Sequence, residues 1–112
     1  MNESEFRDLA DQTIEAIQAA IDDSGMDIDY EESGGVLTLE FENGSKIIFS
    51  KQPPVKQLWM AAKSGGFHFD YDESAQQWIL DSGAHEELYA MLSRLATEQS
   101  GETVSLAAPD LY

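Results

Sequence analysis

Apolar side chains near the start of the chain recur at the three- and four-residue spacing of one face of an α-helix. The series consists of Phe6, Leu9, Ala10, Thr13, Ile14, Ile17, Ala20 and Ile21. This spacing predicts an amphipathic helix of about five turns. We expect Ser4 to cap its N-terminus, and Gly25, which tolerates a left-handed backbone, to end it.

Beyond this helix the period changes to the alternation that is typical of β-strands. We expect strands over residues 27–32, 36–42, 46–49, 57–62, 67–71 and 76–80. Asn43-Gly44 is a strong hairpin signal between the second and third strands. The pattern leaves open whether this turn has two residues or a bulge, and therefore which face of the third strand is buried.

Helical spacing returns over residues 85–99, where the inner stripe is Leu88, Met91, Leu92 and Leu95. Ser82-Gly83 is a candidate cap for this second helix, and Gly101 ends it. The tail is expected to lie on the body because it retains Val104, Leu106, Leu111 and Tyr112. The order helix, strands, helix predicts one α+β domain over residues 1–112: an α-β sandwich with two helices on one face of an antiparallel sheet of five or six strands.

The strand over residues 57–62 carries an aromatic side chain on the face that should be exposed to water. Leu58, Met60 and Ala62 alternate onto the core face, which leaves Gln57 and Trp59 on the other. An indole on an open sheet face is a candidate anchor for a partner protein. The alternative is that a loop or a neighbouring side chain covers Trp59.

Charge is distributed very unevenly along the chain. The 112 residues include 22 acidic and 6 basic side chains, a net charge of −16. Residues 1–32 hold eleven of the acids and one base, Arg7, whereas residues 43–69 hold four lysines and no acid. Nucleic acid is therefore not expected as a ligand, because phosphate binding requires a basic surface. Cations and basic protein surfaces are the natural partners.

The composition also limits the cellular setting and the chemistry. The absence of cysteine excludes disulfides, thiolate metal sites and a cysteine nucleophile. No apolar run approaches the roughly 18 residues of a membrane span. We expect a soluble, cytoplasmic protein that does not enter a membrane.

Carboxylates at helical spacing form the candidate metal site. Those of the first helix continue into the first strand, and the set is Asp8, Asp11, Glu15, Asp22, Asp27, Asp29 and Glu31. If helix and strand lie side by side, these side chains merge into one ridge that attracts hard cations such as iron, manganese, magnesium or calcium. Binding should be weak, because nitrogen and sulfur ligands are missing. The alternative is a solvated helix face that aids solubility.

No catalytic motif accompanies these carboxylates. The two imidazoles, His68 and His85, are not spaced to share a helix face, and His68 is expected to reach solvent beside Asp70. The chain has no Ser-His-Asp order, phosphate-binding loop or dinucleotide fingerprint. We therefore do not expect an enzyme.

Several blocks of the sequence resemble the bacterial branch of the frataxin family, over essentially the full length of the chain. The most specific are Gln57-Leu58-Trp59 and Gly65-Gly66-Phe67-His68-Phe69-Asp70. Gly34-Gly35-Val36-Leu37-Thr38, Gln52-Pro53-Pro54 and Gln99-Ser100-Gly101-Glu102-Thr103 add to the resemblance. Two features depart from it: Ser50 stands where the family often has Asn, and residues 81–87 differ in length and composition.

The resemblance implies a role in iron–sulfur cluster assembly. Weakly bound Fe²⁺ or Fe³⁺ would lie on an acidic ridge that comprises Glu15, Asp22, Asp23, Asp27, Asp29 and Glu31. An IscS-like cysteine desulfurase and an IscU-like scaffold would be the partners. Partner binding would use Gln57 and Trp59 on the sheet and Glu15, Asp22 and Asp23 on the ridge.

Three functional classes remain distinct at this point. The leading hypothesis is a non-enzymatic, iron-binding regulator that acts as a monomer, with iron-driven oligomers left open. The second is a ferroxidase that oxidises and stores iron on the ridge. The third is an acidic interaction module without a metal function.

Overall fold

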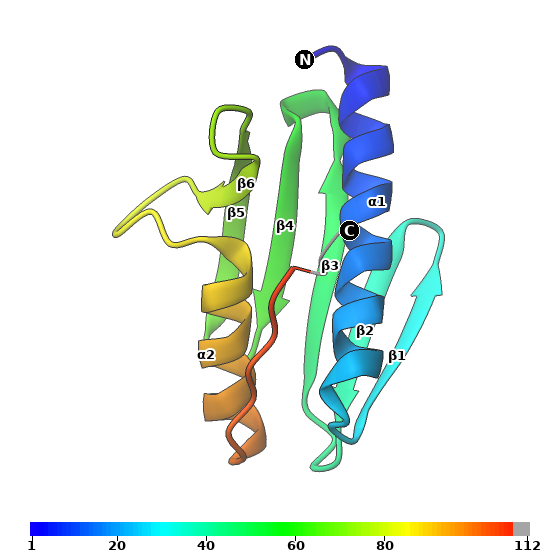
Figure 1. Cartoon of the computed structure of the whole chain (residues 1–112), viewed down its shortest axis with the longest axis vertical. Coiled ribbons are helices and arrows are strands. Elements are labelled where there is room, and N and C mark those ends of the chain that lie inside the picture. Colours follow the sequence, from blue (N-terminus) through cyan, green and yellow to red (C-terminus); the bar gives the residue numbers. More distant parts are fainter. Residues whose placement is uncertain (109–112) are drawn as a thin grey trace.

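The computed structural model describes residues 1–108, which form a six-stranded antiparallel sheet with two helices against one of its faces. The strands are paired in sequence order, from β1 at one edge to β6 at the other. Figure 1 shows both helices in front of the sheet, with the segment that follows the second helix running between them. The elements are α1 (Glu3–Ser24), β1 (Ile28–Ser33), β2 (Val36–Phe41), β3 (Lys46–Gln52), the 3₁₀ turn η1 (Pro53–Val55), β4 (Gln57–Ala62), β5 (Gly65–Asp72), β6 (Gln77–Leu80) and α2 (Leu88–Ser100). The predicted α+β sandwich is confirmed.

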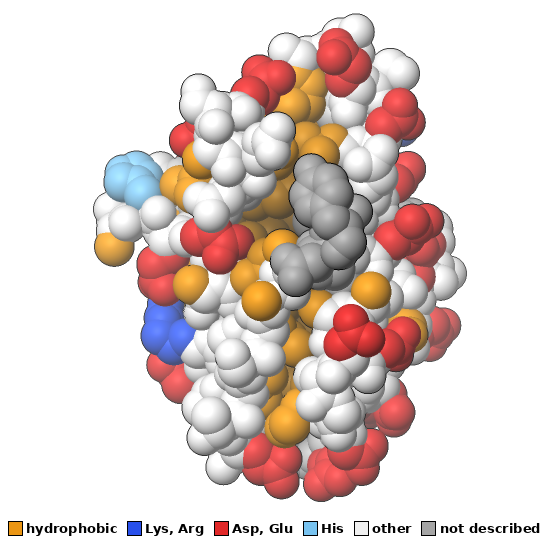
Figure 2. All heavy atoms as spheres, viewed as in Figure 1, with side chains coloured by type: hydrophobic (Ala, Val, Ile, Leu, Met, Phe, Trp, Pro, Cys, Tyr) orange, Lys and Arg blue, Asp and Glu red, His pale blue; other side chains and the backbone are white. Residues whose placement is uncertain are grey.

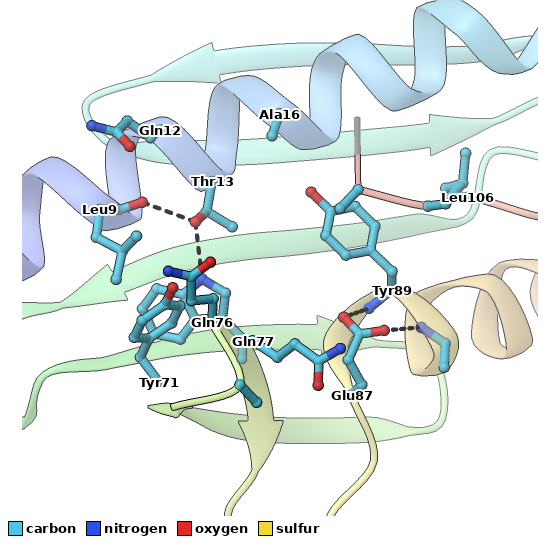
Figure 3. A pocket seen from close by; sticks show the side chains of 15 residues that line it. Leu9, Gln12, Thr13, Ala16, Tyr71, Gln76, Gln77, Glu87, Tyr89 and Leu106 are labelled. Carbon is cyan, nitrogen blue, oxygen red and sulfur yellow. Dashed lines mark hydrogen bonds between the residues drawn. The ribbon is translucent and has the colours of Figure 1, made fainter. Parts of the chain in front are cut away.

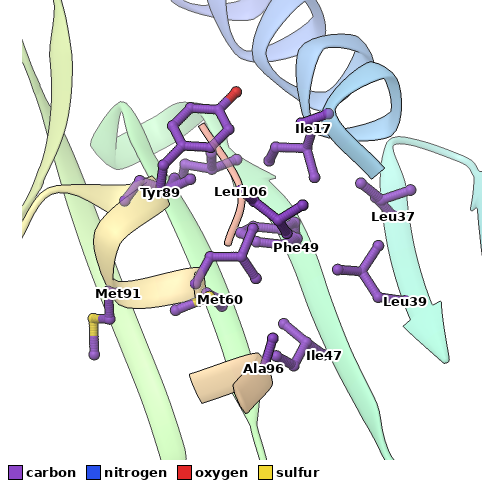
Figure 4. Close-up of a cluster of buried hydrophobic side chains, with 14 of the residues drawn as sticks. Ile17, Leu37, Leu39, Ile47, Phe49, Met60, Tyr89, Met91, Ala96 and Leu106 are labelled. Carbon is purple, nitrogen blue, oxygen red and sulfur yellow. The ribbon is translucent and has the colours of Figure 1, made fainter. Parts of the chain in front are cut away.

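The core lies between the helices and the inner face of the sheet. Figure 4 shows side chains of both helices converging with those of β2, β3 and β4. The predicted inward positions of both helices are buried except Leu9, which is half-buried against the core, and Leu37, Leu39 and Phe41 of β2 and Leu58 and Met60 of β4 are buried as well. Both helices lie on one face of the sheet, so no helix covers the opposite face, which we call the open face. Because side chains alternate along each strand, Trp59 of β4 lies on this open face.

The hairpin between β2 and β3 contains a bulge, which settles the face of the third strand. The Gly44 N–H donates to the Phe41 carbonyl and the Phe41 N–H to the Ser45 carbonyl, each at 2.9 Å. Gly44 has a φ of 84°, the left-handed conformation that closes a three-residue hairpin loop. This register turns Ile47 and Phe49 into the core.

The first helix begins at Glu3, two residues earlier than the predicted cap at Ser4 implies. Asn2, rather than Ser4, is the N-cap: its Oδ1 accepts from the Glu5 N–H at 2.8 Å. The Glu5 carboxylate accepts in return from the Asn2 N–H at 3.1 Å. This reciprocal pair is a capping box, and only Asn2 has a carboxylate three residues later to complete it. Gly25 ends the helix with a φ of 70°, as expected.

The second helix begins at Leu88, so the predicted start at residue 85 is wrong. Glu87 caps it by accepting from the N–H groups of Tyr89 and Ala90. Glu87 also bridges to Ile79 of β6, which draws the preceding segment along the edge of the sheet. His85 lies in the left-handed region, with a φ of 51°, and is therefore outside the helix. Ser82-Gly83 consequently does not cap α2.

The tail packs against α2, as predicted, through residue 106. Val104 and Leu106 are buried. Their N–H groups donate to the hydroxyls of Thr97 and Ser93, each at 2.9 Å. The predictions for Leu111 and Tyr112 lie outside the described residues. Within residues 1–108, neither helix combines the length and apolar character needed to cross a membrane.

Candidate functional site

The eight carboxylates predicted as metal ligands are all exposed and belong to α1, the loop after it, and the edge strand β1. We call this set the acidic edge: Asp8, Asp11, Glu15, Asp22, Asp23, Asp27, Asp29 and Glu31. Figure 2 shows acidic side chains gathered along the side of the molecule that carries α1 and at its lower end. Within the edge, however, the structure brings the carboxylates into several separate groups rather than one continuous ridge.

Asp22 joins α1 directly to β1. The Tyr30 hydroxyl donates to the Asp22 carboxylate, 2.9 Å from each oxygen. This hydrogen bond is the main reason that the pKa of Tyr30 is raised above its ordinary value. Asp23, the next residue along the helix, is exposed. Helix and strand therefore meet as predicted, with the carboxylate of Asp22 at their junction.

A lysine from the middle of the chain enters the acidic edge near the start of α1. Lys51 Nζ donates to Asp11 Oδ1 at 2.6 Å, and the Lys51 side chain is only 21% exposed. The same hollow is lined by Glu15 and by Glu32 at the end of β1. Glu32 was not among the predicted site residues, although alternation after Ile28 and Tyr30 places it on the same face of the strand as those two side chains. Lys51 offsets part of the negative charge here.

Asp29 and Glu31 point to the opposite side of β1. Because Ile28 and Tyr30 face the helix, Asp29 and Glu31 alternate onto the open face of the sheet. There, Asp29 lies opposite Glu40 in the register, and Glu40 lies opposite Lys46. These two carboxylates thus share an edge of the molecule with those of α1, but they occupy a different face of the strand.

Asp27 belongs to a further group, assembled from distant parts of the sequence. It lines a small hollow together with Glu42 of the β2–β3 turn and Glu102, which follows α2. Hydrogen bonding with Asp27, and then the negative charges of Asp27 and Glu102, raise the pKa of Glu42 above its ordinary value. Glu42 and Glu102 were not predicted as site residues, because only the packing of the sheet and α2 brings them together.

The arrangement of these groups limits the kind of metal binding they can provide. Among residues 1–108, no group of three or more His, Cys, Asp or Glu side chains is placed to hold a metal ion. Carboxylate oxygens have the right chemistry for hard cations, including iron. The described residues therefore fit weak attraction of a cation by one or two carboxylates at a time, and they do not fit a closed coordination site.

The open face of the sheet carries the second candidate site. Trp59 is half-buried, and its ring stacks on that of His68, with the ring centroids 4.2 Å apart and the planes within 11°. His68 lies directly opposite Trp59 in the register. Its side chain is 44% exposed, and its Nδ1 lies 4.0 Å from Asp81 Oδ2. Both expectations for Trp59 are thus partly met: it lies on the open face, and a neighbouring side chain covers one side of its ring.

Gln57 connects these aromatic rings to two carboxylates. Its Oε1 accepts from Trp59 Nε1 at 2.9 Å. Its Nε2 donates to Asp70 Oδ1 at 3.1 Å and to Asp81 Oδ2 at 3.2 Å. His85, in contrast, has its Nδ1 3.0 Å from the Leu80 carbonyl oxygen, a contact between the loop before α2 and the end of β6.

A large, mainly apolar hollow lies between α1, β6 and the start of α2 (Figure 3). Trp78 Nε1 donates to the Thr13 hydroxyl, and that hydroxyl donates to the Leu9 carbonyl. Tyr89 lies on the other side, where burial raises its pKa to about 12. The Glu87 carboxylate is engaged by the first N–H groups of α2. Among the described residues that line this hollow, none is a nucleophile paired with a base.

Comparison with known proteins gives concordant results. A family model described as a frataxin-like domain matches residues 1–102. The chain is 55% identical over 104 residues to the iron-sulfur cluster assembly protein CyaY of Pseudomonas aeruginosa, covering 93% of this chain and 95% of that protein. It is 54% identical over 101 residues to the protein of the same name from Ectopseudomonas mendocina, covering 90% of this chain and 91% of that protein.

Solved structures agree with the sequence comparison. Frataxin from Psychromonas ingrahamii superimposes with a TM-score of 0.84 at 44% identity, covering 94% of this chain and 97% of that one. Yeast frataxin superimposes with a TM-score of 0.58 at 26% identity, covering 86% and 77% of the two chains. The resemblance seen in the sequence motifs is confirmed.

Proposed function

The chain belongs to the frataxin family, and from that membership we propose that it acts in iron–sulfur cluster assembly as an iron-binding regulator rather than as an enzyme. Relatives that share about half of its residues are named iron-sulfur cluster assembly proteins. The observation that carries the proposal is the acidic edge: eight exposed carboxylates lie on α1, on β1 and in the loop between them, in a chain of net charge −16.

The concentration of negative charge has an energetic cost that binding a cation relieves. Two carboxylates about 6 Å apart in water repel by roughly 0.7 kcal/mol before screening. Like charges one turn apart on a helix each cost about 0.2–0.5 kcal/mol. A cation near several such groups removes part of each term, and this favours binding even without a rigid ligand set.

Iron is the cargo in this proposal, and the acidic edge holds it weakly. Hard carboxylate oxygens suit both Fe²⁺ and Fe³⁺, and other divalent cations compete for them. Binding is spread over several places, because the carboxylates at Asp11, at Asp22 and at Asp27 form separate groups. It is also sensitive to salt, because all the groups are exposed.

The same charges recruit the partner enzyme. A basic groove on an IscS-like cysteine desulfurase is complementary to the acidic edge, and such complementarity mainly accelerates and orients encounter. Iron and the desulfurase then compete in part for the same carboxylates. The open face of the sheet, with Trp59 near its centre, serves an IscU-like scaffold in the same assembly.

A titration with ferrous iron, followed by amide NMR under anaerobic conditions, tests the proposal. Signals of α1, β1 and the loop between them should broaden or shift first, ahead of those of β5 and β6. The variant Asp23→Lys should weaken both iron binding and desulfurase binding at low salt, and addition of Asp29→Lys should weaken them further. Glu73→Lys, in the β5–β6 turn, changes the net charge equally and serves as the control.

Two outcomes would contradict the proposal. Equal losses for Asp23→Lys and Glu73→Lys would mean that only the overall charge matters. Catalytic consumption of oxygen with iron turnover, abolished by a single substitution, would instead indicate a ferroxidase.

A further inference from the structure

We propose that Gln57 is a positioning residue: it accepts a hydrogen bond from the indole N–H of Trp59 and so holds the ring in one orientation. In that orientation a partner protein binds the apolar surface of the ring. The partner accordingly needs no hydrogen-bond acceptor at this point. The inference rests on the proposed function only in treating the open face of the sheet as a docking surface.

The orientation of the Gln57 amide is determined by its surroundings. Asp70 Oδ1 and Asp81 Oδ2 lie 3.1 and 3.2 Å from one end of the amide. Ionised carboxylates only accept hydrogen bonds, so this end must be the NH₂ group. The other end is then the oxygen, and it lies 2.9 Å from the indole nitrogen of Trp59. Two carboxylates therefore orient the acceptor that the indole requires.

A second contact restrains the indole from the side. His68, directly opposite on β5, stacks on one face of the ring at 4.2 Å. On the β3 side, the residue opposite Trp59 is Ser50, whose side chain is small. The hydrogen bond fixes the rotation of the ring and the stack fixes its tilt. Because His68 stacks on the ring from the β5 side, the other face of the ring is the one turned toward β3.

This arrangement limits the kinds of contact that the Trp59 indole can make with a partner protein. Tryptophan has one polar hydrogen and no acceptor, and here Gln57 already binds that hydrogen. Two apolar side chains lie nearby on the same face: Val36, which is 37% exposed, lies opposite Ser50, and Ile48 lies opposite Ala61. The group that fits is thus an apolar side chain or a proline ring of the partner, packed on the ring surface.

Holding the Trp59 ring in place before binding should increase the affinity for the partner by a measurable factor. Immobilising a side chain with several rotamers on binding costs about 0.5–1.5 kcal/mol, which corresponds to a factor of about 2 to 12 in affinity. The network around Gln57 removes that cost before the partner arrives. Loss of the amide should therefore weaken binding by this factor without removing any atom of Trp59.

The first experiment uses the free protein and follows solvent exchange of the two indole N–H groups by NMR. In Gln57→Ala, the Trp59 signal should exchange at least about tenfold faster. Trp78 donates to the buried Thr13 hydroxyl and provides the internal reference, which should not change. Unchanged exchange at Trp59, or equal acceleration at both indoles, would overturn the positioning role, the latter because it would indicate general destabilisation.

The second experiment measures the affinity of a purified IscU-like scaffold, alone and with the desulfurase. Gln57→Ala should lower the affinity by a factor of about 2 to 12, whereas Glu73→Gln should leave it unchanged. Accelerated exchange at Trp59 with unaltered affinity would show that ring orientation does not matter for docking, and would overturn the inference. If the wild type binds neither protein, the docking function fails, while the exchange experiment still decides whether Gln57 holds the indole.

Discussion

Trp59 and Trp78 each donate an indole N–H to a side-chain oxygen 2.9 Å away, but they lie on opposite faces of the sheet. Trp78 is only 4% exposed and packs edge-on against Phe6. Trp59 is half-buried on the face without helices. Strand alternation distinguishes the two faces around Trp59 from sequence alone. The hydrogen-bond partner of Trp78 could not be predicted, because Thr13 is 65 residues from it along the chain.

The Thr13 hydroxyl should matter more for stability than its small size suggests. Thr13→Val keeps the shape of the side chain but leaves the buried indole N–H of Trp78 without its acceptor. An unpaired buried donor costs about 1–3 kcal/mol, and we expect the free energy of unfolding in urea to fall by that amount. Thr103→Val, at an exposed position in the tail, is the matched control. Equal effects of the two substitutions would show that the Trp78 hydrogen bond contributes nothing specific.

Glu42 should make stability depend on pH in a predictable direction. Its pKa is raised in the folded protein, so the folded state holds the proton more tightly than the unfolded state does. Stability should therefore decrease as pH rises through the range just above 4.5, the ordinary value for Glu, because the folded state must then accept a carboxylate beside Asp27 and Glu102.

Glu42→Gln removes this titrating group and should raise the melting temperature at neutral pH. It should also flatten the pH dependence of that temperature in the same range, as measured by circular dichroism melts. Glu73→Gln removes an equal charge elsewhere and should change the curve less. A steeper dependence in Glu42→Gln than in the wild type would be incompatible with the raised pKa.

At the scale of whole elements, periodicity predicts the approximate position of each helix and strand and the buried face of both helices, of β2 and of β4, but not where a helix begins. The stripe from Leu88 to Leu95 is buried as expected, and so is the stripe from Phe6 to Ile21 except for Leu9, which is half-buried. The start of α2 depends on the bridge between Glu87 and Ile79, a contact with the sheet edge that local spacing does not contain. The buried face of β3 likewise depended on the bulge at Gly44 rather than on its own sequence.

The start of α1 is a different case, because the signal was present locally. Asn2 and Glu5 have the spacing of a capping box, and the structure confirms that both hydrogen bonds form. Asn2→Ala should therefore destabilise the protein by about 1 kcal/mol. Urea unfolding measures the loss, and faster amide exchange at Glu5 would locate it in the first turn. Asn2→Asp keeps an acceptor and should lose much less, so equal losses for the two variants would exclude the capping explanation.

At the scale of the whole molecule, folding redistributes the charge that the sequence shows in blocks. The lysine-rich middle segment does not remain separate, since Lys51 reaches Asp11 across 40 residues. Glu42 and Glu102 approach Asp27 from two other parts of the chain. The sequence predicts the amount of negative charge and its concentration on α1 and β1. It could not predict these groupings, which depend on the order of strands and on the end of α2.

A net charge of −16 on 112 residues should make the folded state sensitive to ions. Screening weakens repulsion between exposed carboxylates, and the compact state benefits most because it holds them closest together. We expect the melting temperature to rise with sodium chloride. For a domain of this size, each 1 kcal/mol gained corresponds to about 4–8 °C.

Divalent cations distinguish general screening from binding at the acidic edge. If the edge binds cations, magnesium or manganese should raise the melting temperature more than sodium does at equal ionic strength, because a ligand that binds only the folded state adds its own stabilisation. The double variant Asp23→Asn/Asp29→Asn should lose part of this additional increase, whereas Glu73→Gln should retain it. If sodium and magnesium act equally at matched ionic strength, then the carboxylates only repel one another, and the cation-binding part of the proposed function loses its physical basis.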